Sequence, residues 1–254
     1  MTALITGATS GIGYEIAKIL CEKSINLVLA SRNISKMKEL EKEFQKVKVS
    51  SIEIDLSLQD SAFELYKKIK DLGIEIDILI NNSGFGILGS FKSNDINKIN
   101  NMINLNVLSL VLLTKLYADD MISKRKGYIM NIASTASFQP IPYFGVYAAT
   151  KAFVRHFTLS LYHELKKYNV NIININPGAT RTNFLNVAMD GDKPNLIKSL
   201  FAMNTKEVAE LSVNAMFKGK KELTTGIMNK ITTKIFPLVP FKLTYKIISK
   251  YLEN

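Results

Sequence analysis

The sequence predicts an α/β fold with a doubly wound parallel sheet, and two observations support this. Short apolar runs rich in β-branched residues alternate with longer segments whose apolar residues recur at helical spacing. Strands and helices in this order require right-handed crossovers, which cover both faces of a parallel sheet with helices. The expected strands are 3–6, 26–30, 47–55, 76–81, 127–133 and 170–176, and the expected helices between them are 11–22, 34–45, 59–72, 94–122 and 147–168.

We expect one domain over residues 1–254, because no linker or shift of composition interrupts the alternation. Residues 1–182 form the expected cofactor-binding and catalytic core. Residues 183–254 form an expected extension on the substrate side, with a loop, a helix at 205–217, a short strand at 223–225 and a basic apolar tail at 231–252.

Composition excludes some classes of protein. A hydrophobic fraction of 47% with 22% charged residues is typical of a globular protein. The net charge of +11 suits an anionic partner, but the lysines are spread along helices and no nucleic-acid-binding motif is present, so we expect no nucleic acid partner. Cys21 is the single cysteine, and the first residues lack a secretory signal, which together predict a cytoplasmic protein. His156 and His163 lie seven residues apart and form no ligand cluster with acidic or cysteine residues, so we expect no metal site.

A glycine-rich turn, Thr6-Gly-Ala-Thr-Ser-Gly-Ile-Gly13, follows the first strand and opens the first helix. Such a turn brings the backbone close to a pyrophosphate, and the helix N-terminus supplies unpaired N–H groups. The alternative is a simple tight turn, but the strand before and the helix after favour a Rossmann-type dinucleotide site. The residues expected to contact the cofactor here are Gly7, Thr9, Ser10, Gly11, Ile12 and Gly13.

The second strand is followed by Ser31 and Arg32, where an acidic residue would bind the ribose of NAD. The forked cation of Arg32 suits the additional phosphate of NADP instead, and Ser10 can add a hydroxyl. We therefore expect NADP(H), the alternative being an ordinary surface arginine.

Tyr147 and Lys151 are four residues apart and so share one helix face. A lysine ammonium there would lower the pKa of the tyrosine toward the working range. The spacing alone identifies nothing, because it recurs at Tyr14/Lys18, Tyr66/Lys70 and Tyr162/Lys166. Tyr147 differs because Ser134 follows the expected strand 127–133, at the end where α/β sheets place their sites.

The Gly-x-x-x-Gly-x-Gly turn and the Ser134, Tyr147, Lys151 set resemble the short-chain dehydrogenase/reductase family, over residues 2 to about 182. Asn81-Asn-Ser-Gly84 resembles the family's Asn-Asn-Ala-Gly. The resemblance implies that Asp55 and Leu56 hold the adenine ring, the alternative being that Asp55 caps the next loop. It also implies that Asn106 holds a relay water; the alternatives are that the nearby Asn104 does so, or that Asn106 is a core polar group. It also implies cofactor contacts from Asn82, Ser83, Gly84, Pro177, Gly178, Thr180 and Thr182, and a homodimer or homotetramer.

We expect Tyr147 to act as general acid in reduction and as base in oxidation. Lys151 would lower its pKa and hold the nicotinamide ribose, and Ser134 would hydrogen-bond the substrate oxygen. The expected enzyme transfers a hydride between NADP(H) and a carbonyl or secondary alcohol: a ketone, an aldehyde, a 3-oxoacyl or a steroid-like substrate. The alternative is a non-catalytic NADP(H)-binding sensor or scaffold, which has no need of all four catalytic residues.

The substrate walls are expected at Phe85, Gln139, Tyr143 and the segment 183–203. The tail at 231–252 mixes apolar residues with lysines. It can form a lid, a subunit contact or a membrane-surface segment. We expect packing or a lid in preference to a membrane contact, because a tail that closes such a domain usually buries its apolar face.

Overall fold

The computed structural model describes residues 1–182, 184, 188, 202–235 and 238–239. Most of the expected substrate loop and most of the expected tail lie outside these residues.

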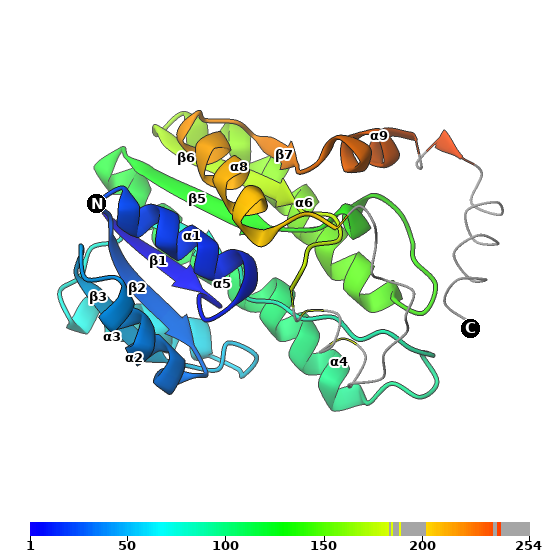
Figure 1. Ribbon diagram of the computed structural model, residues 1–254, viewed down its shortest axis with the longest axis horizontal. Helices are drawn as coiled ribbons and strands as arrows, with labels where there is room; N and C mark the ends of the chain where they lie inside the picture. Colours follow the sequence, from blue (N-terminus) through cyan, green and yellow to red (C-terminus); the bar gives the residue numbers. More distant parts are fainter. Residues whose placement is uncertain (183, 185–187, 189–201, 236–237, 240–254) are drawn as a thin grey trace.

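Seven parallel strands form one sheet in the order β3-β2-β1-β4-β5-β6-β7, which confirms the predicted fold class (Figure 1). The chain builds outward from β1 to β3, then returns to β4 beside β1 and builds in the other direction. The carboxyl ends of β1 and β4 therefore lie where the strand order reverses, which is where α/β sheets bind ligands. The strands are β1 Thr2–Thr6, β2 Asn26–Ser31, β3 Val49–Glu53, β4 Ile78–Asn81, β5 Gly127–Ile132, β6 Val170–Asn176 and β7 Glu222–Thr224.

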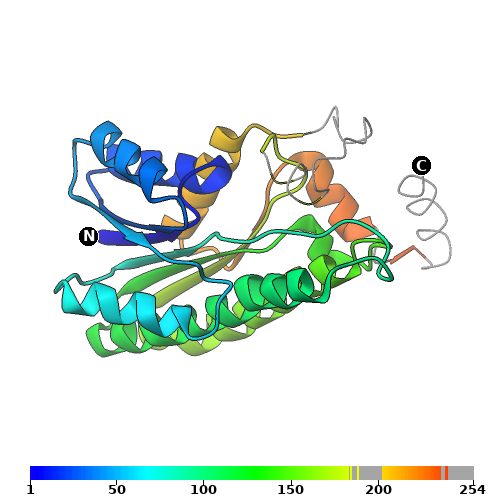
Figure 2. The ribbon, with the colours of Figure 1, turned by 90° about the horizontal axis from the view of Figure 1, so that it is seen from below.

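Helices cover both faces of the sheet (Figure 2). One face packs against α1, α2 and α8, and the other against α3, α5 and α6. The central strands are apolar on both faces, and Leu4 and Ile5 of β1 are completely buried on opposite sides. The helices are α1 Gly11–Glu22, α2 Ile34–Glu43, α3 Ser61–Asp71, α4 Ile96–Ile103, α5 Ser109–Lys124, α6 Gly145–Lys166, α8 Thr205–Phe217 and α9 Ile227–Ile235.

The helix expected at 94–122 is divided by a π-helical turn, η1 (Asn104–Leu108). The N–H of Ser109 bonds to the carbonyl of Asn104, five residues back, and so widens the helix locally. By length and composition the segment Ile96–Lys124 could cross a membrane. Its Leu113, Tyr117 and Met121 are nevertheless buried against the sheet, as in a core helix.

Candidate active site

A cleft of about 590 Å³ opens at the carboxyl ends of the strands. Most of the residues expected from the sequence line it, although they come from seven separate segments of the chain. They are Gly7, Thr9, Ser10, Gly11, Ile12, Ser31, Arg32, Asp55, Leu56, Asn82, Ser83, Gly84, Ser134, Tyr147, Lys151, Pro177, Gly178, Thr180 and Thr182. Gly13 and Asn106 lie behind the lining.

The glycine turn at the start of α1 is shaped for a phosphate. Gly7 and Gly11 have φ angles of +67° and +58°, which side-chain-bearing residues rarely adopt. A Cβ at Gly13 would strike the Asn82 side chain and the Gly7 carbonyl, so only glycine lets α1 approach β4 this closely. The backbone of the turn is therefore open to a pyrophosphate at the N-terminus of α1, and these residues fit a dinucleotide.

The end of β4 fixes the shape of this turn. Asn82 Nδ2 donates to the carbonyls of Thr6 and Gly7, both at 3.0 Å. In return, Thr6 Oγ1 accepts from the backbone N–H groups of Asn82 and Ser83, also at 3.0 Å. The Asn-Asn-Ser-Gly segment thus supports the phosphate turn and also lines the cleft.

Arg32 and Asp55 lie at the end of the cleft that the carboxyl ends of β2 and β3 form. Arg32 Nη1 is 3.7 Å from Asp55 Oδ2, and the Arg32 side chain is 75% exposed. Asp55 Oδ1 accepts from the N–H and the Oγ of Ser57 at 2.9 and 2.7 Å, so Asp55 also caps its own loop. Because the Arg32–Asp55 distance of 3.7 Å is longer than a hydrogen bond, the guanidinium group of Arg32 remains available to bind a phosphate.

Tyr147 lies at the centre of the cleft wall, near the start of α6, and is 6% exposed. Its ring stacks on Phe144 at 4.4 Å between centroids and packs against Phe184 at 5.3 Å. Burial raises the pKa of Tyr147 to about 12, and a hydrogen bond with the Ser134 side chain acts in the opposite direction. Ser134 is held in turn as the N-cap of the 3₁₀ turn η2 (Thr135–Phe138), where its Oγ accepts from the N–H of Ala136 at 3.1 Å.

Lys151 lies one turn along α6 from Tyr147, and its Nζ is 5.8 Å from the Tyr147 ring centroid. The Nζ donates to the Ile132 carbonyl at 2.8 Å. Burial lowers the pKa of Lys151 to about 8. In this structure burial raises the pKa of Tyr147 and lowers that of Lys151, because burial disfavours the charged form of each group.

Asn106 lies completely buried in the π-helical turn. Its Nδ2 donates to the Phe85 carbonyl at 2.9 Å and to Thr150 Oγ1 at 3.2 Å, and its Oδ1 accepts from the Phe85 N–H at 3.1 Å. A Cβ at Gly84 would lie 3.0 Å from Asn106 Oδ1 and 3.3 Å from Lys151 Nζ. Asn106 therefore holds the Gly84–Phe85 wall next to Lys151.

The segment after β6 lines the cleft beside the glycine turn. Thr180 Oγ1 donates to the Gly178 carbonyl at 3.0 Å, and Thr182 Oγ1 accepts from the N–H of Phe184 at 3.2 Å. A Cβ at Gly11 would lie 3.2 Å from the methyl group of Thr182. Thr182 is thus next to the phosphate turn.

The substrate walls are partly those that the sequence predicted. Phe85 and Gln139 line the cleft. Tyr143 does not: its φ of +59° turns the backbone, and it lines a neighbouring hollow of about 350 Å³. Phe184, from the expected segment 183–203, also lines the cleft. Sequence reasoning missed several further lining residues: Phe138, Ile141, Phe144, Thr232 and Thr233. Phe144, three residues before Tyr147, is the one that helical spacing could have identified.

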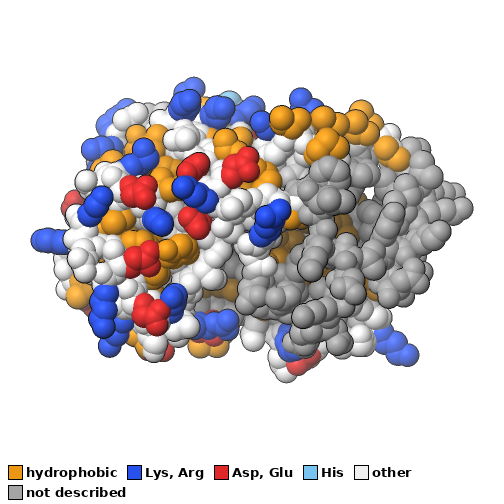
Figure 3. All heavy atoms as spheres, in the orientation of Figure 1, with side chains coloured by type: hydrophobic (Ala, Val, Ile, Leu, Met, Phe, Trp, Pro, Cys, Tyr) orange, Lys and Arg blue, Asp and Glu red, His pale blue; other side chains and the backbone are white. Residues whose placement is uncertain are grey.

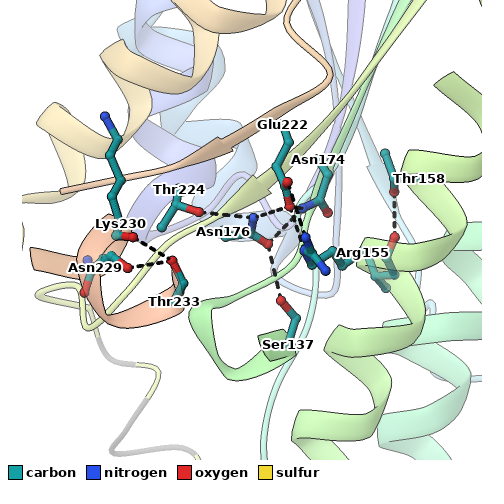
Figure 4. A network of polar contacts seen from close by, with 11 residues as sticks. Ser137, Arg155, Thr158, Asn174, Asn176, Glu222, Thr224, Asn229, Lys230 and Thr233 are labelled. Carbon is teal, nitrogen blue, oxygen red and sulfur yellow. Dashed lines mark hydrogen bonds and ion pairs between the residues drawn. The ribbon is translucent and has the colours of Figure 1, made fainter. Parts of the chain in front are cut away.

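A polar network behind the cleft joins α6, η2, β6 and β7 (Figure 4). Arg155, eight residues after Tyr147 on α6, donates through Nε to Glu222 Oε1 at 2.7 Å and through Nη2 to Oε2 at 3.4 Å. Glu222 Oε1 also accepts from Asn176 Nδ2 at 2.9 Å. The Arg155 guanidinium lies 4.2 Å from the ring centroid of Phe138, the last residue of η2. One carboxylate therefore connects the helix of Tyr147, the strand that leads into Pro177 and, through Arg155, the turn that follows Ser134.

Comparisons with known proteins agree with this geometry. A family model described as short chain dehydrogenase matches residues 1–193. A very-long-chain 3-oxoacyl-CoA reductase of Rattus norvegicus is 33% identical over 267 residues, covering 99% of this chain and 80% of the relative. An NADP-dependent 3-hydroxy acid dehydrogenase of Schizosaccharomyces pombe is 33% identical, covering 85% of this chain and 86% of the relative.

Among solved structures, a short-chain dehydrogenase from Sphingobium yanoikuyae in complex with NADPH matches with a TM-score of 0.82 and 25% identity. The match covers 94% of this chain and 96% of that one. The chain is therefore a member of the short-chain dehydrogenase/reductase family, a family of oxidoreductases that transfer a hydride to or from a carbonyl or alcohol carbon.

Proposed function

We propose that the protein is an NADP(H)-dependent reductase of 3-oxoacyl thioesters with long apolar chains. The observation that carries this proposal is the division of the cleft. Its nucleotide side presents glycine backbone, hydroxyls and Arg32, whereas the wall around Tyr147 is aromatic, with Phe138, Phe144 and Phe184. A carbonyl next to a long hydrocarbon chain suits this wall, and two of the relatives above are named for 3-oxoacyl and 3-hydroxy acid substrates.

Bound NADPH supplies the hydride that reduces the carbonyl carbon. Tyr147 gives its phenolic proton to the carbonyl oxygen, so that an alcohol forms. A pKa of about 12 keeps this tyrosine protonated, as a general acid must be. Ser134 hydrogen-bonds the same oxygen and stabilises the negative charge that develops on it.

Lys151 and Asn106 take part in returning a proton to Tyr147. With a pKa of about 8, Lys151 exchanges protons near neutral pH, which suits a group that returns a proton toward Tyr147. We propose that Asn106 positions the relay water from behind Gly84, and that Lys151 also binds the nicotinamide ribose. Arg32 and Ser10 bind the additional phosphate of NADP.

We also propose a cytoplasmic homodimer or homotetramer. The buried single cysteine, Cys21, suits a reducing compartment. Leu108 of η1 and Phe153 of α6 are 44% and 46% exposed on neighbouring helical segments, where a second copy would cover them. Sedimentation equilibrium tests this assembly.

The test is NADPH oxidation, followed by absorbance, with 3-oxoacyl thioesters of increasing chain length and with short ketones and steroid ketones as comparison substrates. We expect kcat/KM to rise with chain length. If NADPH binds tightly but no carbonyl compound is reduced, the protein is a sensor or scaffold instead. If steroid ketones exceed all acyl thioesters, the acyl assignment is wrong.

A further inference from the structure

Helix α9 has its polar and apolar faces reversed with respect to a surface helix of a globular protein. Its inward face is polar: Thr233 is 8% exposed, Thr232 and Thr233 line the cleft, and Asn229 packs against Gly178. Its outward face is apolar. An apolar strip of large side chains faces solvent there, with exposed fractions of 76% for Ile227, 49% for Met228, 45% for Ile231, 52% for Ile235 and 83% for Leu238 just beyond the helix.

The apolar strip is continuous. At 3.6 residues per turn, Ile227, Met228, Ile231 and Ile235 fall within an arc of about 100° of the helix surface. Figure 3 shows hydrophobic side chains gathered at the rim of the molecule where Figure 1 places α9. A soluble surface helix points such a face at the core, so this face requires an apolar partner.

The charges near the strip indicate the chemistry of that partner. Lys230 and Lys234 are exposed at one border of the strip, and α9 contains no acidic residue. A second copy docked on this face would bring lysines against lysines. Residues 240–254 carry Lys242, Lys246 and Lys250 and a single acidic residue, so they also match the strip poorly in charge. An apolar strip bordered by cations at a protruding rim is complementary to a membrane surface with anionic lipids.

We propose that α9 docks the protein on an anionic membrane surface, with the apolar strip inserted among the lipids and Lys230 and Lys234 at the headgroups. Because Thr232 and Thr233 of the same helix line the cleft, docking places the cleft next to the bilayer. Carbonyl compounds with long hydrocarbon chains would then enter from the lipid, a consequence that rests on the proposed function. The sequence alone favoured packing or a lid for the tail, and the exposed fractions of α9 now favour the membrane.

Flotation of the full chain with vesicles tests the docking without any enzymatic activity. Vesicles of phosphatidylcholine containing phosphatidylserine should carry the wild type, and vesicles of phosphatidylcholine alone should carry less. Ile231→Glu with Ile235→Glu should weaken binding to the anionic vesicles by roughly 30-fold or more. The matched control is Phe63→Glu on α3 with Leu72→Glu at the C-cap of α3, where the exposed fractions are 47% and 61%, and it should bind as the wild type does.

A second pair of variants separates local charge from total charge. Lys230→Glu with Lys234→Glu should weaken binding by at least roughly 30-fold, since each basic residue at an anionic surface contributes roughly fivefold and each glutamate adds repulsion. Lys38→Glu with Lys42→Glu on α2 changes the net charge equally and should have a much smaller effect.

A wild type that stays out of both vesicle fractions overturns the proposal. Light scattering then identifies the alternative: a lower mass for the Ile231/Ile235 variant assigns the strip to a contact between copies, and an unchanged mass assigns it to residues 240–254 or to another protein. Equal losses in the α9 and α3 variants would also overturn it. If the protein floats but reduces no carbonyl compound, the docking stands and the proposed function fails.

Discussion

The two halves of the cleft are built by different means. The nucleotide half, at β1 to β3, depends on backbone conformation: positive φ angles at Gly7 and Gly11 and a close approach at Gly13. The reaction half, at β4 to β7, depends on buried polar side chains. Asn81 of β4 donates to Asn131 of β5 at 2.9 Å, and Asn174 donates to Asn176 within β6 at 2.8 Å, in a sheet interior where asparagine is uncommon.

This difference follows from what each half must hold. Backbone N–H groups suffice for phosphates, whose charge is spread over several oxygens. Proton transfer needs two or three side chains held to within a fraction of an ångström. Arg155 and Glu222 supply that constraint although they are 67 residues apart in sequence.

The largest effect is expected in the reaction half. Ser134→Ala removes the hydrogen bond to the developing alkoxide and one partner of Tyr147. We expect kcat to fall about 10²- to 10³-fold with little change in NADPH affinity. Steady-state kinetics measure kcat, and fluorescence titration measures the dissociation constant of NADPH. A loss of NADPH affinity as large as the loss of kcat would mean that the nucleotide half and the reaction half of the cleft do not act independently.

In the nucleotide half, Arg32→Asp should reverse the cofactor preference. The loss of a charge-assisted hydrogen bond and the added repulsion should raise KM for NADPH about 10- to 100-fold and lower KM for NADH. Comparing kcat/KM for the two cofactors checks this. NADPH use that survives without a gain for NADH would show Arg32 to be an ordinary surface arginine.

The network behind the cleft should affect both stability and turnover. Arg155→Met leaves the Glu222 carboxylate, 23% exposed, without its cation, which should cost about 2 kcal/mol of unfolding free energy and lower kcat about tenfold. Urea unfolding measures the free energy of unfolding, and steady-state kinetics measure kcat. Lys70→Met is the control, because Lys70 pairs with Asp120 at 2.7 Å and neither residue lines the cleft, so this variant should leave kcat unchanged. A stable Arg155→Met enzyme with full kcat would refute positioning by Arg155.

The smallest effect concerns Lys151, whose burial works against folding. Its folded pKa of about 8 lies below the ordinary 10.5, so the penalty is full below about pH 8 and disappears as the pH rises toward 10.5. Lys151→Met should therefore raise the unfolding free energy at neutral pH by about 1 to 2 kcal/mol, the lost bond to Ile132 offsetting part of the gain. Urea unfolding near pH 7 and near pH 10 tests this: the difference between variant and wild type should shrink at high pH. A less stable variant at neutral pH would contradict the account.

Local sequence patterns predict most of the fold. Each expected strand is present, and the strand expected at 47–55 is shortened to Val49–Glu53. The π-helical turn was missed because one additional residue in a helix leaves the apolar spacing of 94–122 nearly unchanged. Helix α9 was missed because its apolar residues were interpreted together with the tail, although they face outward.

The site was predictable where it is local in sequence. The glycine turn, Ser134, Tyr147 and Lys151 have fixed spacings, and they do line one cleft. The Arg155–Glu222 pair and the approach of Thr232 and Thr233 were not predictable, since tertiary packing alone brings them there. The prediction for Tyr143 was wrong because its positive φ turns the backbone, so that Phe144 lines the cleft and Tyr143 lines the neighbouring hollow.

The central claim is that Tyr147 gives its proton to a carbonyl oxygen while bound NADPH supplies the hydride. Turnover of Tyr147→Phe with NADPH and an accepted 3-oxoacyl thioester tests it most directly. We predict a loss of about 10²- to 10⁴-fold in kcat, with an NADPH dissociation constant close to that of the wild type. Near-full turnover by this variant would contradict the claim.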